Sequence, residues 1–169
     1  GQTLIWQMNY DPAEDKPYFH PLATRAGDVV TWHRPADHTW HRAHWFAWKL
    51  INEVNYWEED ESTGLSEGRT EIVEVRVDRS HEPRAVINMQ LAYRQPDGAI
   101  VLRENRRVTA HPPDEQGSYR LDWDHAFTAG DRQIVLDRTL PEKHGGPGHG
   151  GYGGFSYRAA EAMMHDARL

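Results

Sequence analysis

The strongest constraint on the fold is an alternation of apolar and polar residues between positions 69 and 140. Residues 73–77 read VEVRV, residues 87–93 read INMQLAY, and residues 119–127 read YRLDWDHAF. A period of two is typical of a strand that buries one face. Between two of these segments, Pro96-Asp97-Gly98 is a typical hairpin turn. The spacing leaves no room for crossover helices, so we predict an all-β, antiparallel sandwich.

The remaining segments fit a single β-sandwich domain over residues 1–169. Residues 3–8 and 29–33 are expected to add short strands, and residues 159–168 a short C-terminal helix. Two loops interrupt the pattern: an acidic surface loop at 58–68 and a Gly-rich loop at 145–154, which has seven glycines. Neither loop carries the Gly-Lys-Ser/Thr ending of a phosphate-binding loop.

Composition excludes several classes of function. The chain has no cysteine, which rules out disulfides, thiolate metal sites and a cysteine nucleophile. The net charge of −7 argues against nucleic acid as a partner. No apolar run reaches the roughly 18 residues of a transmembrane helix, so we expect no membrane partner. The chain begins at Gly1 without a signal pattern, and we expect that residues preceding it have been removed.

A dense group of histidines and tryptophans indicates where the protein acts. The stretch 35–48 reads PADHTWHRAHWFAW, with histidines at every third position from 38 to 44. Imidazole titrates near neutral pH, binds metals and relays protons, and indole offers a flat face to a ring. We expect a loop here that leads into a strand.

Three interpretations of this group are open. His38, His41 and His44 could bind a divalent metal, although their spacing matches no recognised ligand motif. The same side chains could act as acid and base on a substrate. They could also be ordinary aromatic residues at a sheet edge. Arg42 could steer a carboxylate or simply pair with Asp37. One or two of five tryptophans could line a pocket: Trp32, Trp40, Trp45, Trp48 and Trp57.

One further residue could act as a base. Glu104 lies on a predicted strand as a candidate general base. We expect it to face solvent opposite Arg106 or Arg107 instead.

Three elements of the chain resemble the PmoA-type family of bacterial proteins. Residues 16–48 (KPYFHPLATRAGDVVTWHRPADHTWHRAHWFAW) are similar to a P-Y-F-H-P-L element followed by D-H-P-x-H-x-G-L-W-F-A-W. Residues 52–60 (NEVNYWEED) resemble an N-G-V-D-F-W segment, and residues 150–158 (GGYGGFSYR) resemble G-G-Y-G-G-L-x-x-R. The family is named for methane oxygenase, which suggests a histidine-ligated metal protein as an alternative function.

The resemblance implies a sandwich similar to the galactose-mutarotase-like proteins, which points by analogy to a carbohydrate ligand. In such sites a histidine and a carboxylate share proton transfer at a sugar. The catalytic positions implied here are His20, Asp37, His38 and His41, with Asp37 orienting one histidine. The substrate-binding candidates are Arg42, Trp40, His44, Trp48 and Tyr152. The resemblance also favours a secreted or periplasmic location.

The chain departs from these motifs at Thr39, where Pro is usual, and at Ala43 and Glu53, where Gly is usual. Family members are also nearly twice as long. We therefore expect a shortened sandwich whose sheet a second copy or a partner chain completes. The sequence predicts a carbohydrate-active or carbohydrate-binding protein that uses either no cofactor or one divalent metal. A non-catalytic glycan-binding module is the other alternative.

Overall fold

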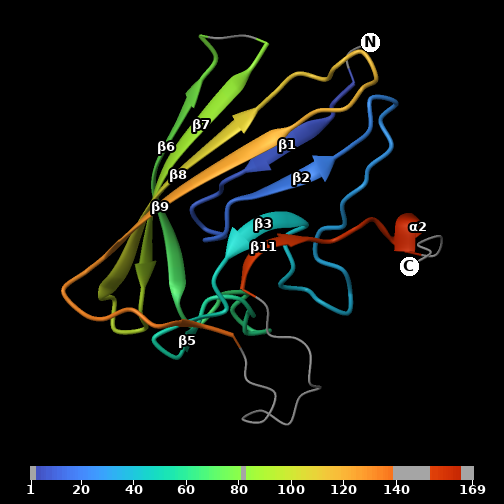
Figure 1. Ribbon diagram of the computed structural model, residues 1–169. Helices are drawn as coiled ribbons and strands as arrows, with labels where there is room; N and C mark the ends of the chain where they lie inside the picture. The colour runs from blue at the N-terminus through green and yellow to red at the C-terminus, as the bar shows by residue number, and fades with distance from the viewer. Residues whose placement is uncertain (1–2, 81–82, 139–152, 165–169) are drawn as a thin grey trace.

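A computed structural model describes residues 3–80, 83–138 and 153–164. Within these ranges the regular secondary structure is almost entirely β, which confirms the all-β prediction (Figure 1). The strands are β1 (Trp6–Asn9), β2 (Tyr18–Leu22), β3 (His44–Ala47), β4 (Leu50–Ile51), β5 (Val54–Asn55), β6 (Arg69–Asp78), β7 (Ala85–Arg94), β8 (Ile100–Ala110), β9 (Leu121–Ala129), β10 (Leu136–Asp137) and β11 (Gly154–Tyr157). One helical turn, α2 (Glu161–Met164), follows them. No helix in the described part is long and apolar enough to cross a membrane.

The large sheet is the antiparallel meander β6-β7-β8-β9 that the alternation predicts. Gly98 closes its central hairpin with φ of 86°, and Gln95 and Ala99 pair across the turn. The two edges of this sheet differ. β6 contains a bulge between Ile72 and Glu74, whereas β9 pairs with β8 in unbroken register over its whole length.

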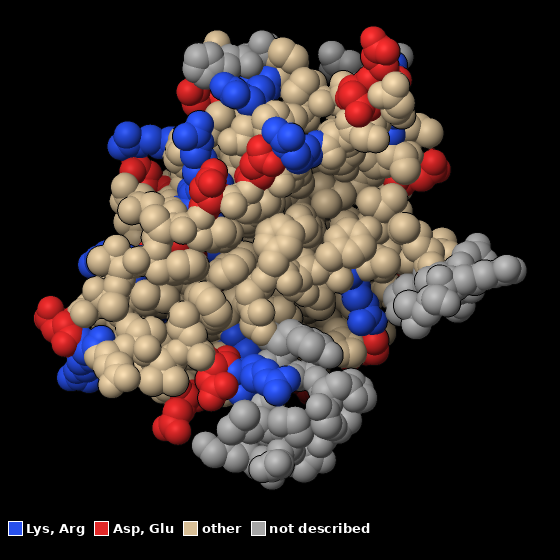
Figure 2. Space-filling model, in the orientation of Figure 1, with Lys and Arg blue, Asp and Glu red and all other residues tan. Residues whose placement is uncertain are grey.

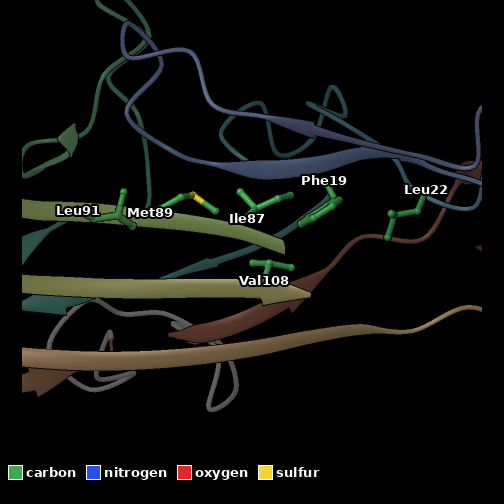
Figure 3. Packing of buried hydrophobic residues seen from close by; sticks show 6 residues of the cluster. All are labelled: Phe19, Leu22, Ile87, Met89, Leu91 and Val108. Carbon is green, nitrogen blue, oxygen red and sulfur yellow. The ribbon is translucent and has the colours of Figure 1, made fainter. Parts of the chain in front are cut away.

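The small sheet has the order β1-β2-β3-β11, so it joins the beginning of the chain to residues 154–157. All its pairs are antiparallel. Apolar side chains from both sheets fill the space between them (Figure 3). The buried members are Phe19 and Leu22 from β2, Ile87, Met89 and Leu91 from β7, and Val108 from β8. Burial of this set is the main stabilising contribution between the layers.

A third sheet, of three two-residue strands, has the order β10-β4-β5 and packs against the large one. Its buried cluster consists of Ile51, Tyr56, Tyr93, Val101 and Leu102. Gly68 is required here, because a Cβ on this residue would lie 2.4 Å from Cζ of Tyr56. The β4–β5 turn places two non-glycine residues in the left-handed region, Asn52 with φ of 50° and Glu53 with φ of 67°.

Several local predictions need correction. Residues 29–33 form only isolated bridges, since Val29, Thr31 and His33 each pair at a single position. The acidic loop is exposed at 60–63, but Glu59 is buried in ion pairs, because it neutralises two buried cations. Of the expected C-terminal helix only residues 161–164 are helical in the described part. Most of the Gly-rich loop lies outside the described residues.

Candidate functional site

A pocket of about 630 Å³ lies beside β11, where the predicted His/Trp group folds against the edge of the small sheet. Its lining comes from three separate parts of the sequence. The residues are His38, Trp40, His41, Lys49, Trp57, Glu58, Gly153, Phe155, Ser156, Tyr157 and Arg158. The volume is within the range of small-molecule sites.

The loop before β3 positions the histidines of the pocket. His38 N donates to the Pro35 carbonyl and His41 N to the His38 carbonyl, both at 2.9 Å, so the segment winds through two consecutive turns. Ala43 then has φ of 65°, a conformation that favours glycine. β3 begins directly after this bend, and the His41 ring contacts the ring of Trp45.

His41 is a buried polar group of the pocket, with 8% of its surface exposed. Its Nε2 lies 3.0 Å from Oγ of Ser156, and its Nδ1 is buried without a partner in the described part of the chain. The ring stands edge-on to Trp45 and Trp57. Burial, and then the positive charge of Arg158, lower the pKa of His41 to about 4. The imidazole is therefore neutral at neutral pH and can both donate and accept a hydrogen bond.

His38, Asp37 and Arg158 form a polar group at the exposed rim. Oδ2 of Asp37 accepts a hydrogen bond from Nη2 of Arg158 at 2.6 Å and lies 2.9 Å from Nδ1 of His38. The hydrogen bond from Arg158, and then the closeness of His38, hold the pKa of Asp37 below its usual value. Asp37 thus stays ionised beside the His38 ring, which is where a carboxylate that orients a base would lie.

The lining of the pocket also combines aromatic and charged groups. Trp57 packs on Trp45 with ring centroids 4.5 Å apart, and Trp40 lies over His38. Lys49 forms an ion pair with Glu58 through its ammonium group. Two indole rings therefore meet polar side chains of both charges within one cavity.

The comparison with known families identifies the chain at the level of a family. The profile of DUF6807, described as a family of unknown function, matches residues 1–168. The chain belongs to DUF6807. No curated protein and no solved structure matches it significantly.

Of the site residues predicted from the sequence, this DUF6807 chain brings His38, Trp40 and His41 into the pocket and Asp37 to its rim. The other candidates in the described part do not line it. His20 Nδ1 lies 3.0 Å from Thr31 Oγ1, and its ring lies beside His33. Tyr152 lies outside the described residues.

Two further candidates, Arg42 and His44, do not line the pocket. Arg42 is buried and pairs with Glu59 and Glu14, and not with Asp37. His44 lies on the inner face of β3 against Trp123 and Phe155. Trp48, farther along the chain, packs against Phe46 and Phe127.

The metal alternative has no support in the geometry of the described residues of this DUF6807 chain. Within residues 3–80, 83–138 and 153–164, no three His, Asp or Glu side chains are arranged to hold an ion. Although His38 and His41 line the pocket, His44 faces the other layer.

Five functional candidates of this DUF6807 chain were missed or only partly anticipated from the sequence. They are Lys49, Trp57, Glu58, Ser156 and Arg158. Trp57 was one of the tryptophans from which one or two were expected to line a pocket. Trp40 and Trp57 are the two that line it. Ser156 and Arg158 lie at the end of the Gly-rich motif at residues 150–158. That motif is the one feature of the sequence from which these residues could have been predicted.

A second polar group lies between the sheets and corrects the prediction for Glu104. This residue is buried, accepts hydrogen bonds from Arg106 Nε at 2.6 Å and from the Tyr93 hydroxyl, and lies 2.7 Å from His125 Nδ1. Burial alone would raise the pKa of Glu104, but the charge of Arg106 and the hydrogen bonds lower it to about 2. Its partners Tyr93, Arg106 and His125 lie on the inner faces of β7, β8 and β9. The register of these strands brings the partners together around Glu104.

Proposed function

We propose that this protein binds a carbohydrate in the pocket beside β11 and transfers a proton on the bound sugar. The observation that carries the proposal is the combination of Trp40 and Trp57 with His38 and His41 in one cavity. Indole faces suit the C–H-rich face of a sugar ring, and polar groups of both donor and acceptor type suit its hydroxyls. The volume of about 630 Å³ leaves room for a ligand of this size.

The polar residues take different roles in the proposal. His38, oriented by Asp37, is the acid–base group, because it lies at the open rim and its carboxylate partner stays ionised. His41 is held neutral and fixed on Ser156, so it binds a hydroxyl group. The Lys49–Glu58 ion pair contributes a donor and an acceptor to the same ligand.

The resemblance to the PmoA-type family supports the same proposal. All three resembling elements contribute to the pocket: His38 and His41 from the first, Trp57 from the second, and Ser156 from the third. The two positions where those motifs usually carry Gly, Ala43 and Glu53, both have left-handed backbone. The backbone thus retains the shape that a Gly-containing motif favours.

Calorimetric titration with a panel of neutral and acidic mono- and oligosaccharides tests the proposal. A sugar that binds wild type should bind Trp40→Ala about ten times more weakly, because one aromatic wall is lost. Tyr10→Ala, an exposed aromatic residue outside the pocket, should bind as wild type does. If no sugar binds, or if Trp40→Ala binds as wild type does, the pocket does not recognise carbohydrate.

Proton transfer is tested separately, by following exchange of deuterium from solvent into the bound sugar or its change of anomer by NMR. His38→Asn should abolish the exchange while sugar binding persists. The chain provides a matched control in His111, which lies 2.8 Å from Asp122 at the end of the large sheet. His111→Asn should leave the exchange unchanged. Binding without any exchange in wild type would reduce the function to glycan binding.

A further inference from the structure

The outer edge of β9 differs from the other edge of the same sheet. Unpaired edges template pairing with other chains, and proteins block them with charges and bulges. β6 has both protections, with a bulge at Ile72/Glu74 and five charged residues among its ten. β9 has neither along most of its length: its register is unbroken, and its acidic residues, Asp122 and Asp124, both lie in its first half.

The apolar side of β9 is also incompletely covered. Trp123, His125 and Phe127 follow one another on its inner face, with ring centroids 5.9 Å apart at each step. Phe127 is 37% exposed, and residues 126–129 are all exposed. Figure 2 shows a broad uncharged area across the middle of the molecule, with most charged side chains at its margins. Exposed aromatic surface of this kind marks an interaction site.

Among the described residues β9 pairs only with β8, so its second edge is available to a further strand. Antiparallel pairing of β9 with a second copy of itself, centred on His125, would place residue 124 opposite residue 126 and residue 122 opposite residue 128. Each aspartate then faces a neutral residue, Ala126 or Thr128. Trp123 faces Phe127, an aromatic pair of the kind that stabilises adjacent strands.

Other registers fit less well. A centre at residue 124 places Asp124 opposite its own copy, and a centre at residue 123 places Asp122 opposite Asp124. Like charges directly opposite one another destabilise a strand pair. The centre at His125 also lies at the middle of the strand, which gives the largest overlap of its nine residues.

We propose that this chain forms a two-fold dimer through its β9 strands, which join the two large sheets into one continuous sheet. A second copy is the occupant that the strand itself specifies, because β9 is complementary to itself in charge and in aromatic pairing. Such an interface is isologous and closed, which limits assembly to a dimer. The inference does not depend on the sugar pocket.

Sedimentation equilibrium of the full chain over a wide concentration range tests the dimer. Ala126 is exposed and lies opposite Asp124 of the second copy, so substitutions there report on the register. Ala126→Asp creates two like-charge pairs and should raise the dissociation constant about tenfold, while Ala126→Lys creates two opposite-charge pairs and should lower it. Wild type should form a reversible dimer whose dissociation constant lies between those of the two variants.

Asn105 provides matched controls, because it faces the same side of the sheet and pairs with Ala126 from the neighbouring strand β8. Asn105→Asp and Asn105→Lys make the same changes in net charge away from the edge, and both should keep the wild-type dissociation constant. A wild-type protein that stays monomeric overturns the proposal. It is also overturned if Ala126→Asp and Ala126→Lys have equal dissociation constants. The same holds if the Asn105 substitutions change the dissociation constant as much as the Ala126 substitutions do.

Discussion

Nε2 of His41 lies 3.0 Å from Oγ of Ser156, which joins the loop before β3 to a strand 115 residues later. The contact is one of several between these segments: β11 pairs with β3, and Arg158 bonds Asp37. β11 and the residue that follows it therefore hold in place the loop that carries His38 and His41.

Ser156→Ala should destabilise the protein and loosen the pocket. A buried nitrogen of His41 loses its partner, which costs about 1–3 kcal/mol in the free energy of unfolding. Chemical denaturation measures that loss, and titration with a bound sugar should show weaker affinity. Ser80→Ala, in an exposed turn, is the control and should change neither quantity. Unchanged stability of Ser156→Ala would mean that water replaces the hydroxyl.

Stability should fall as the pH decreases from about 6.5 to about 4. Burial lowers the pKa of His41 and of His33 to about 4, whereas each titrates near 6.5 in the unfolded chain. Between these values the unfolded state binds more protons, so acid favours unfolding. Melting temperatures across this range measure the effect. His33→Gln should reduce the dependence on pH, and an unchanged profile would contradict the low pKa.

Glu104→Gln should cost about 3–5 kcal/mol in the free energy of unfolding, because Arg106 is left as a buried, uncompensated charge. The pH dependence distinguishes this from a packing defect. The pKa of Glu104 is lowered to about 2, so its stabilisation is complete above the unfolded value near 4.5 and is lost as the pH falls toward 2. Denaturant titrations at pH 7 and pH 3 should show a smaller difference between variant and wild type at pH 3. Glu74→Gln, at a half-buried position of β6 with a side chain that pairs with Arg76, is the control.

Glu53→Gly should stabilise the protein by about 1 kcal/mol. Glu53 is exposed and has φ of 67°, a conformation that costs a non-glycine residue roughly 1–2 kcal/mol. It follows Asn52, so the substitution creates the Asn-Gly pair that a two-residue hairpin turn prefers. Thermal unfolding should show a higher midpoint. Glu61→Gly removes the same charge from another exposed loop and should not raise it.

The fold was predictable where the sequence is locally regular. The alternation through residues 73–127 predicted β6 to β9 and the inner faces of β7 and β9, because a strand with one buried face needs no distant information. In β6, however, Val73 and Val77 are exposed, and in β8 Glu104 is buried instead of facing solvent. The two-residue strands β4, β5 and β10 are too short to show a period. The segment 29–33 has strand-like composition, but Val29, Thr31 and His33 each form a single bridge to a different segment.

The site was predictable in part, for reasons that lie in the backbone. His38, Trp40 and His41 were identified by their density in the sequence, but a regular strand would place His44 with His38. The left-handed bend at Ala43 ends that alternation before β3 begins. Ser156 and Arg158 could not be assigned because their partners are more than a hundred residues away.

The place of β11 in the small sheet has a consequence for the order of folding. The meander β6-β7-β8-β9 consists of contacts between neighbours in sequence, and such contacts form early and locally. The pocket instead waits for residues 154–158, which must close a loop back to residues 37–47. During synthesis the protein can therefore hold much of its β-structure while ligand recognition is still missing, and a nascent or clipped chain lacking β11 would be folded in part yet unable to bind.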